Sequence, residues 1–270
     1  MAGFPDGPEI ELPRGDVTEG VVRIGDTVRR PRSAVSAVVA EYLEHLARAG
    51  FDGAPRYLGQ DDQGRDVLTF VDGDVPGDPV DAWARADRVL TSVGRLVRRL
   101  HEASAGWRPD APIPVPPGRP TAQLPQDEPR LFTHRDVTPQ NTVFRGGVAV
   151  ALVDFDLIGE TTRSIDLANT AMHWVPLLDP VDRAAGYDGI DVGTRLRLLL
   201  DGYGRDAVDG ELLLRGARRR FATGYASMKW NAENLGGGWA RMWEAGVGDV
   251  IRRRAAWFDT VEHELRAALS

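Results

Sequence analysis

A short polar loop between two apolar strands constrains this chain more than any other feature. The sequence LFTHRDVTPQNTVF covers residues 131–144, and its ends, LFT and TVF, are typical of β-strands. The middle cannot continue either strand, because Pro139 has no backbone donor and Asp136 and Asn141 are poor strand formers. The pattern therefore predicts a loop that holds several polar side chains at fixed positions, and loops of this kind commonly carry chemistry.

A second acidic segment follows at a short distance. Asn141 comes five residues after Asp136, and Asp154, in the sequence VDFD, comes thirteen residues after Asn141. Asn141 opens a hairpin that turns on Gly146-Gly147, and Asp154 ends it, so both oxygen-bearing side chains are expected at one site. Such a pair suits Mg²⁺, which keeps water and phosphate oxygens as its other ligands. Asp136 is then free to accept or orient a hydroxyl proton, as phosphoryl transfer requires.

These segments resemble the catalytic machinery of protein-kinase-like enzymes. HRDVTPQN is similar to their catalytic loop, and VDFD is similar to the segment that carries their metal-binding aspartate. The continuation, DFDLIGETTRSIDLANT, resembles the aminoglycoside phosphotransferase family more than protein kinases, because a second acid stands at Asp156 and an Asp-Leu-Ala helix start at Asp166. The resemblance implies an α+β, two-lobed protein-kinase-like fold, with a small β-rich lobe over residues 1–74 and a larger helical lobe over 75–270.

The resemblance also implies a function. It predicts a phosphotransferase that moves the γ-phosphoryl group of ATP or GTP to a hydroxyl of a small molecule, such as an antibiotic or a metabolite. Asp136 is expected to act as the base, and Asn141 and Asp154 to hold Mg²⁺. Two alternatives stay open: a sugar, choline-like or nucleoside kinase on the same fold, and a pseudokinase that binds nucleotide with little or no activity.

Apolar periodicity and turn residues outline both lobes. A hairpin is expected over 21–30, a helix over 33–50, a pair of strands over 55–73, a helix over 81–104, and further helices near 166–175, 191–203, 206–234 and 238–268. The connector DGDVPGDP at 72–79 marks the expected boundary between the lobes.

The resemblance implies a lysine that holds the nucleotide phosphates, and this chain needs a substitute for it. The only lysine is Lys229, so an arginine of the first hairpin must take that role or leave it empty. A two-residue turn at Gly25-Asp26 pairs Val22 with Arg29, which places Arg29 on the same face as a residue suited to contact adenine. The Arg-Arg-Pro spacing also resembles the family's Lys-x-Pro pattern and selects Arg29. We therefore predict that Arg29 and Val22 contact the nucleotide.

Three further residues complete the predicted site. Gly15 and Gly20 lie in PRGDVTEG, a glycine-poor loop whose backbone is expected to approach the phosphates. The helix glutamate that usually partners the lysine has no clear equivalent, because Glu41 lies off the apolar stripe. Asp156, two residues after the metal aspartate, is the first candidate to contact a cationic or hydroxyl-rich acceptor.

Composition narrows the class of partner. The net charge of −7 argues against a nucleic-acid partner, and the longest apolar run, VAVALV at 148–153, is too short to span a membrane. The chain has no cysteine and its start lacks the pattern of a secretory signal. We therefore expect a soluble cytoplasmic protein, and the sequence leaves its oligomeric state open.

Overall fold

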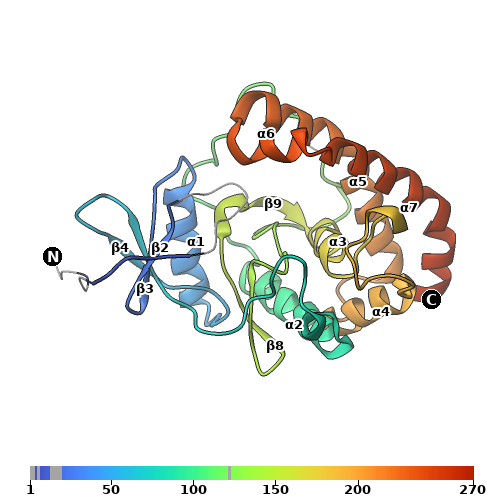
Figure 1. Ribbon diagram of the computed structural model, residues 1–270, viewed down its shortest axis with the longest axis horizontal. Helices are drawn as coiled ribbons and strands as arrows, with labels where there is room; N and C mark the ends of the chain where they lie inside the picture. Colours follow the sequence, from blue (N-terminus) through green and yellow to red (C-terminus); the bar gives the residue numbers. More distant parts are fainter. Residues whose placement is uncertain (1–3, 5–6, 13–19, 121–122) are drawn as a thin grey trace.

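The computed structural model describes residues 4, 7–12, 20–120 and 123–270 of the chain. An antiparallel sheet with one long helix forms the N-terminal part, and the C-terminal part is mainly helical (Figure 1). The α+β, two-part architecture predicted from the sequence is confirmed.

The elements follow one another in an order that keeps most strands in the first half of the chain. The strands are β1 (Ile10–Glu11), β2 (Val22–Ile24), β3 (Thr27–Arg30), β4 (Tyr57–Gln60), β5 (Asp66–Thr69), β6 (Arg130–Thr133), β7 (Thr142–Arg145), β8 (Val148–Leu152) and β9 (Gly159–Thr162). The α-helices are α1 (Ser36–Arg48), α2 (Asp87–Ala103), α3 (Arg163–Trp174), α4 (Val192–Tyr203), α5 (Gly210–Leu235), α6 (Gly237–Glu244) and α7 (Val247–Leu269). Short 3₁₀ turns occur at Ala82–Arg85, Phe155–Leu157 and Pro180–Asp182.

The N-terminal sheet has the strand order β1-β2-β3-β5-β4, and all of its neighbours are antiparallel. Gly25 adopts a φ of 58° in the two-residue turn between β2 and β3, where a tight hairpin needs positive φ. Val22 pairs with Arg29 and Ile24 pairs with Thr27. The register predicted from the sequence is therefore confirmed.

Helix α1 packs against one face of this sheet through its apolar stripe. Val28 and Leu68, which are paired across β3 and β5, belong to the same hydrophobic core as the stripe of α1. The buried members of the stripe are Val38, Val39, Tyr42, Leu43 and Leu46. Because side chains alternate along a strand, Arg30 lies on the same face of β3 as Val28, and Arg29 lies on the opposite face.

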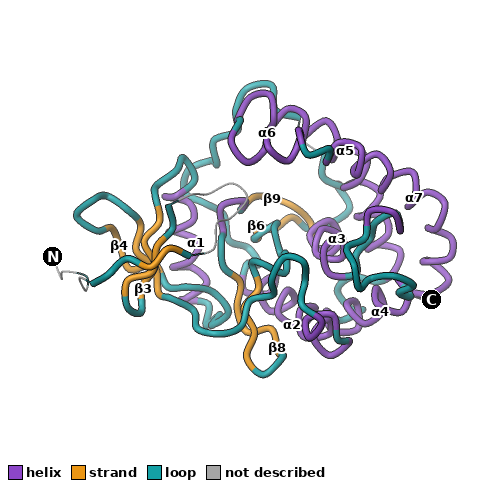
Figure 2. The backbone as a smooth tube through the Cα atoms, in the orientation of Figure 1, coloured by secondary structure: helices purple, strands orange, loops and turns teal. Residues whose placement is uncertain are grey.

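Close helix packing forms the base of the C-terminal part. A Cβ atom on Gly94 of α2 would lie 2.3 Å from the Leu199 carbonyl oxygen, and one on Gly202 of α4 would lie 2.2 Å from the Thr91 carbonyl oxygen. Only glycine allows α2 and α4 to approach so closely. Strands β6 and β9 form one pair and β7 and β8 another, beside this helical block (Figure 2).

The structure differs from the predicted elements in several places. The helix expected over 81–104 is divided at Ala86, which is extended, into a 3₁₀ turn and α2. The helix expected over 238–268 is divided into α6 and α7, because Gly246 adopts a φ of 91°. The sequence analysis also missed β9, a short polar strand that pairs with β6. Asp74 forms an isolated bridge with Phe144, so the chain has joined the second hairpin by that point. The lobe division at residue 74 stays a prediction.

The described residues include no helix that is both long and apolar enough to cross a membrane.

Candidate active site

The loop between β6 and β7 holds Asp136 and Asn141 side by side. The Asn141 side-chain amide donates one hydrogen bond to the Asp136 carboxylate at 2.9 Å and another to the Asp136 carbonyl oxygen at 3.0 Å. Two turns close the loop. The backbone N–H of Thr138 donates to the Asp136 carbonyl oxygen, and the backbone N–H of Asn141 donates to the Thr138 carbonyl oxygen. The amide nitrogen of Asn141 is thereby engaged, which directs its side-chain oxygen elsewhere and leaves it suited to a cation.

His134 braces this loop. Its Nε2 lies 2.8 Å from the Val153 carbonyl oxygen, and its Nδ1 accepts a hydrogen bond from the backbone N–H of Asp136 at 3.2 Å. Nδ1 is therefore an acceptor, so Nε2 carries the proton and donates to Val153. The His134 ring also contacts the Phe155 ring, with centroids 4.4 Å apart. A single side chain thus ties the catalytic loop to the segment around Asp154.

Asp154 stands at the end of β8 in a strained conformation. Its φ is 63°, and Arg135, directly before Asp136, has a φ of 64°. These are the two non-glycine residues with positive φ among the described residues, and such strain gathers at functional sites. The backbone N–H of Val153 donates to the Asn141 carbonyl oxygen at 2.9 Å, which places the two predicted metal ligands on neighbouring strands.

This donor set fits Mg²⁺. The Asp154 carboxylate is 39% exposed, and the Asn141 amide oxygen is the second available ligand. No group of three or more His, Cys, Asp or Glu side chains suited to a metal occurs within the described residues. A site with one carboxylate and one amide oxygen is typical of Mg²⁺ that also binds substrate phosphates, because the phosphates and water supply its other ligands.

Arg30, and not Arg29, reaches this site from the sheet. One Arg30 nitrogen, Nη2, lies 3.2 Å from a carboxylate oxygen of Asp154 and also contacts the carboxylate of Asp156. Arg29 points to the other face of β3, where Nε lies 3.6 Å from a carboxylate oxygen of Asp61 and Nη1 contacts Thr27. The contact of Arg29 with the phosphates therefore stays a prediction, and Arg30 is the arginine of this hairpin that reaches Asp154. The register was correct, and the face of β3 that meets Asp154 is that of Arg30.

Val22, like Arg29, keeps its nucleotide role as a prediction only. It shares the face of Arg29, and N-terminal residues cover that face: the Phe4 ring lies 5.4 Å from the Arg29 guanidinium carbon, and Gly7 lies against Ile24. Protein atoms thus occupy the surface that we had assigned to adenine. Gly20 adopts a φ of 75° directly before β2, whereas Gly15 lies outside the described residues.

Comparisons with known proteins agree with this geometry. The chain is 30% identical over 198 residues to the trifolitoxin immunity protein of Rhizobium leguminosarum bv. trifolii, an alignment that covers 68% of this chain and 70% of that protein. Residues 116–199, which include Asp136, Asn141 and Asp154, match the model of the phosphotransferase enzyme family. The chain belongs to the phosphotransferase enzyme family.

Solved structures of low sequence identity share its fold. A choline/ethanolamine kinase family protein from Mesorhizobium loti aligns with a TM-score of 0.62 at 17% identity, over 97% of this chain and 92% of that one. An amicoumacin kinase aligns with a TM-score of 0.59 at 12% identity, over 98% and 90% of the two chains. This phosphotransferase family member therefore has the kinase-like fold along nearly its whole length.

Asp156 lies in the cleft of the phosphotransferase, beside Asp154. Its side chain is 25% exposed and contacts Arg30. The sequence analysis assigned Asp156 to the acceptor, and that role stays a prediction. The contact instead suggests that Asp156 orients the arginine that faces the phosphates.

Asp166 has a structural role inside α3. Its carboxylate lies 2.8 Å from Nε2 of His101 and 3.5 Å from the Thr133 hydroxyl, and Thr162, not Asp166, caps the helix. His101 was expected to bond the carbonyls at its own helix end. It lies instead between Asp166 and the Tyr203 hydroxyl, 2.8 Å from each. This buried chain of polar groups fixes α2, α3 and α4 beneath the catalytic loop.

Glu41 does not partner Arg30. Its carboxylate accepts the backbone N–H of Asp110, at 3.1 and 3.3 Å from the two oxygens. The partners of Arg30 are two aspartates after β8 rather than a glutamate of α1. Arg30 is thus held by the C-terminal part of the chain.

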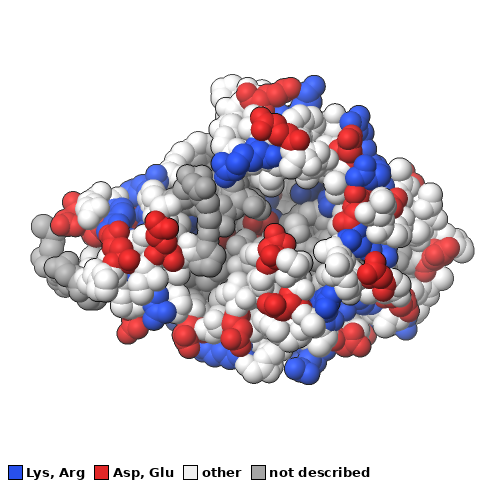
Figure 3. Space-filling view, viewed as in Figure 1, with Lys and Arg blue, Asp and Glu red and all other residues white. Residues whose placement is uncertain are grey.

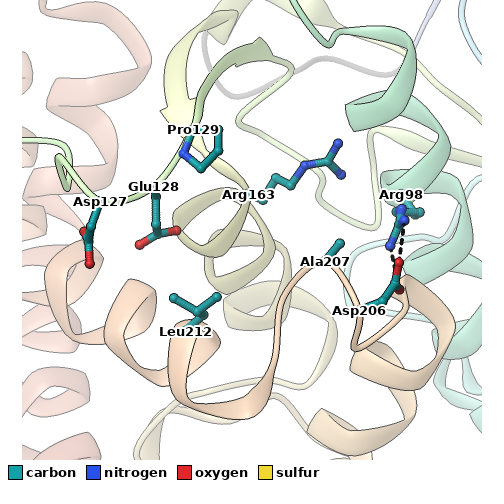
Figure 4. A pocket seen from close by; sticks show the side chains of 8 residues that line it. All are labelled: Arg98, Asp127, Glu128, Pro129, Arg163, Asp206, Ala207 and Leu212. Carbon is teal, nitrogen blue, oxygen red and sulfur yellow. Dashed lines mark hydrogen bonds and ion pairs between the residues drawn. The ribbon is translucent and has the colours of Figure 1, made fainter.

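A cavity of about 360 Å³ lies away from this site, and its lining includes Arg98, Asp127, Glu128 and Asp206 (Figure 4). Its charged groups already have protein partners: Arg98 forms a two-pronged pair with Asp206, and Arg215 pairs with Asp127 and Glu128. The cavity contains none of the residues described above, so we place the chemistry at the loop and not there.

Proposed function

We propose that this protein transfers the γ-phosphoryl group of ATP or GTP to a hydroxyl group of a small molecule. Family membership supports the general class, a small-molecule phosphotransferase. The finer assignment gives Asp136 the role of base, Asn141 and Asp154 the role of Mg²⁺ ligands, and Arg30 contact with the phosphates.

The observation that carries this proposal is the ion pair between Arg30 and Asp154. It joins a strand of the N-terminal sheet to the segment after β8, 124 residues later. A guanidinium against the proposed metal ligand stands where the triphosphate of a kinase substrate must lie, between a cation and the catalytic loop. The pseudokinase alternative rested on the missing lysine and the missing helix glutamate, and the Arg30 contact with Asp154 supports a substitute for the first.

The chemistry assigned to the chain is modest. Asp136 accepts the proton of the acceptor hydroxyl as the hydroxyl oxygen forms a bond to the γ-phosphorus, and the bond from that phosphorus to its bridging oxygen breaks. Asn141 holds the Asp136 carboxylate in place through its amide. Arg30 offsets negative charge on the phosphates. When bound, Mg²⁺ supplies further charge neutralisation on the phosphate oxygens.

Named relatives support the choice of co-substrate and metal class. The amicoumacin kinase structure was solved with AMP-PNP, Ca²⁺ and its antibiotic, which favours a nucleoside triphosphate and a divalent cation here. The relative from Rhizobium is named for immunity to trifolitoxin. A toxin or antibiotic is therefore one acceptor class for this chain, and a metabolite such as a sugar, choline-like compound or nucleoside is the other.

A transfer assay tests the proposal. The purified protein is incubated with Mg²⁺ and γ-labelled ATP or GTP, together with a panel of hydroxylated metabolites and antibiotics. We expect label in at least one acceptor and none with Asp136→Ala. Calorimetry of nucleotide binding with and without EDTA is the parallel measurement. Equal affinity in both conditions, together with no transfer, would support the pseudokinase alternative instead.

A further inference from the structure

We propose that the acceptor carries an anionic group, a carboxylate or a phosphate, which binds Arg220 of α5 and Arg254 of α7 while its hydroxyl faces Asp136. This inference rests on the proposed function and specifies its substrate class. It runs against the cationic acceptor that the sequence suggested through Asp156.

Arg220 is connected to the catalytic loop by a single residue. Asn169 of α3 accepts a hydrogen bond from Nε of Arg220 at 2.9 Å and donates one to the Arg135 carbonyl oxygen at 2.8 Å. Asn169 is 7% exposed, so this link is firmly held. The guanidinium of Arg220 is therefore fixed beside the residue that precedes Asp136, on the helical side of the site and away from Arg30.

Arg254 adds a second cation at the same place. Desolvation, followed by the charge of the neighbouring Arg220, lowers the pKa of Arg254 to about 10. Desolvation also lowers the pKa of Arg220, and the charge of Arg135 adds to that effect. Three arginines from the loop, α5 and α7 thus repel one another in one region. Repulsion between like charges destabilises the fold unless a negatively charged group lies among them.

The chain supplies no carboxylate partner for these groups within the described residues. The contacts of Arg220 and Arg254 are an amide oxygen, the Met172 sulfur and the Phe221 ring, and Nε of Arg254 is buried with no hydrogen-bond acceptor from the described residues. The arrangement is unusual in this acidic chain, where arginines elsewhere commonly pair with Asp or Glu. Buried cations are normally paired, so the cluster points to a bound anion.

Three nearby acids act on these arginines, and each has another partner or an assigned role. Asp166, which acts on Arg135, bonds His101. Asp182, which acts on Arg254, is engaged by both Nε and Nη2 of the adjacent Arg253. Asp136 acts on Arg220 but is assigned to the acceptor hydroxyl. Figure 3 shows a hollow in the surface between α6 and the body of the molecule.

The cluster also explains why Arg30 is not the acceptor's anion site. Arg30 already contacts two carboxylates, whereas Arg220 and Arg254 present charge without such partners. An arginine fork matches a carboxylate or phosphate well, and a hydrogen bond between charged groups contributes about 1.5–3 kcal/mol. That range corresponds to roughly 10- to 100-fold in affinity.

Matched acceptors test the inference. Hydroxylated compounds are assayed in sets that share one scaffold and carry a carboxylate, a phosphate, a neutral carboxamide or an amine. We expect kcat/KM for an anionic member to exceed that of its carboxamide and its amine at least about 10-fold. A preference for the amine or the carboxamide would overturn the inference while leaving the proposed function intact. The carboxylate and phosphate arms identify which anion is bound.

Variants test the assigned residues. Arg254→Gln and Arg220→Gln should each raise the KM of the anionic acceptor on the order of 10- to 100-fold and leave that of the carboxamide unchanged. Arg252→Gln is the matched control, since it removes an equal charge from α7 at an exposed residue paired with Asp249. An equal rise in the KM of ATP would assign the cluster to the nucleotide and refute the inference. Circular dichroism checks that each variant folds.

A binding measurement decides the matter even if no acceptor in the panel is phosphorylated. Inorganic sulfate is titrated at constant ionic strength while the ring of His173, which feels Arg254 and Arg220, is followed by NMR. We expect the pKa of His173 to rise with sulfate in the wild type and not in Arg254→Gln. No change in the wild type would overturn the anion site. Failure of the proposed function would instead appear as no binding of Mg-nucleotide and no transfer.

Discussion

Two groups of arginines face the same cleft with opposite electrostatic arrangements. Arg30, from the sheet, lies against the carboxylates of Asp154 and Asp156. Arg220 and Arg254, from the long helices, bond an amide oxygen and a thioether sulfur and have no carboxylate partner among the described residues. The first group is neutralised by the chain, and the second keeps its charge.

This difference separates two tasks that one cleft must perform. On the side that we propose for the nucleotide, Asp154 is assigned a metal and also holds Arg30, so charge is balanced before the substrate arrives. On the acceptor side, uncompensated positive charge selects the ligand, because a cation would be repelled and an anion attracted. The following predictions test whether the two sides are independent.

The largest effect on activity is expected from Asp136, which lies between the nucleotide side and the acceptor side of our proposal. Asp136→Ala should lower kcat on the order of 10²- to 10⁴-fold, the usual scale for a positioned base, and leave nucleotide affinity nearly unchanged. Steady-state kinetics and calorimetry measure the two quantities. Retention of most of the activity would remove Asp136 from its role.

The next largest effect is expected from Arg30, and it should change the nucleotide KM only. Arg30→Gln removes the cation that faces the phosphates, so we expect the nucleotide KM to rise about 10- to 100-fold with the acceptor KM unchanged. Arg29→Gln serves as control, because Arg29 lies on the opposite face of β3 against Asp61. A larger effect from Arg29→Gln than from Arg30→Gln would support the assignment made from sequence.

Asp154→Asn should weaken nucleotide binding only when the metal is present. We expect the wild type to bind nucleotide much more tightly with Mg²⁺ than with EDTA, and the variant to lose most of that difference. Isothermal calorimetry in both conditions measures it. If the variant kept the full Mg²⁺ dependence, Asp154 would not be a ligand.

A smaller effect is expected from Asp156. When Asp154 holds the metal, Asp156 is the remaining partner of Arg30 among those described here, so Asp156→Asn should raise the nucleotide KM about threefold, the scale of a partly exposed ion pair. The acceptor KM should not change. A selective rise in the KM of an aminated acceptor, weakened by salt, would instead favour the cationic acceptor.

The smallest effect is a change in the titration of His173. Desolvation, followed by the charges of Arg254 and Arg220, lowers the pKa of His173 to about 3. Arg254→Gln removes one of these causes, so the pKa should rise, whereas Arg30→Gln should leave it unchanged. NMR titration of the ring measures it, and equal shifts in both variants would mean that the two sides are coupled.

The same shift has a consequence for stability. The unfolded chain protonates His173 near pH 6.5, and the folded chain does so only near pH 3, so stability falls as the pH drops through this window. The free energy of unfolding should depend less on pH in Arg254→Gln, because the pKa of His173 is lowered less in that variant. Denaturant unfolding at several pH values checks the sign.

The sequence alone determined the loop and the hairpins. Asp136 and Asn141 lie in a loop because Pro139 and the flanking apolar triplets leave the chain no other local structure. The turn at Gly25-Asp26 determined the register of β2 and β3, since a two-residue turn allows only one pairing. These features depend on neighbours within a few residues, so a sequence pattern contains them.

Tertiary structure alone decided which face of β3 meets the site. Strand alternation requires Arg29 and Arg30 to point to opposite sides, but it cannot say which side is the cleft. Phe4 and Gly7 cover one face and α1 packs on the other, and this packing brings Arg30 to Asp154. The basic cluster was hidden for the same reason. Arg135, Arg220 and Arg254 come from a loop and two helices far apart in sequence, and only the packing of α3, α5 and α7 brings their charges together.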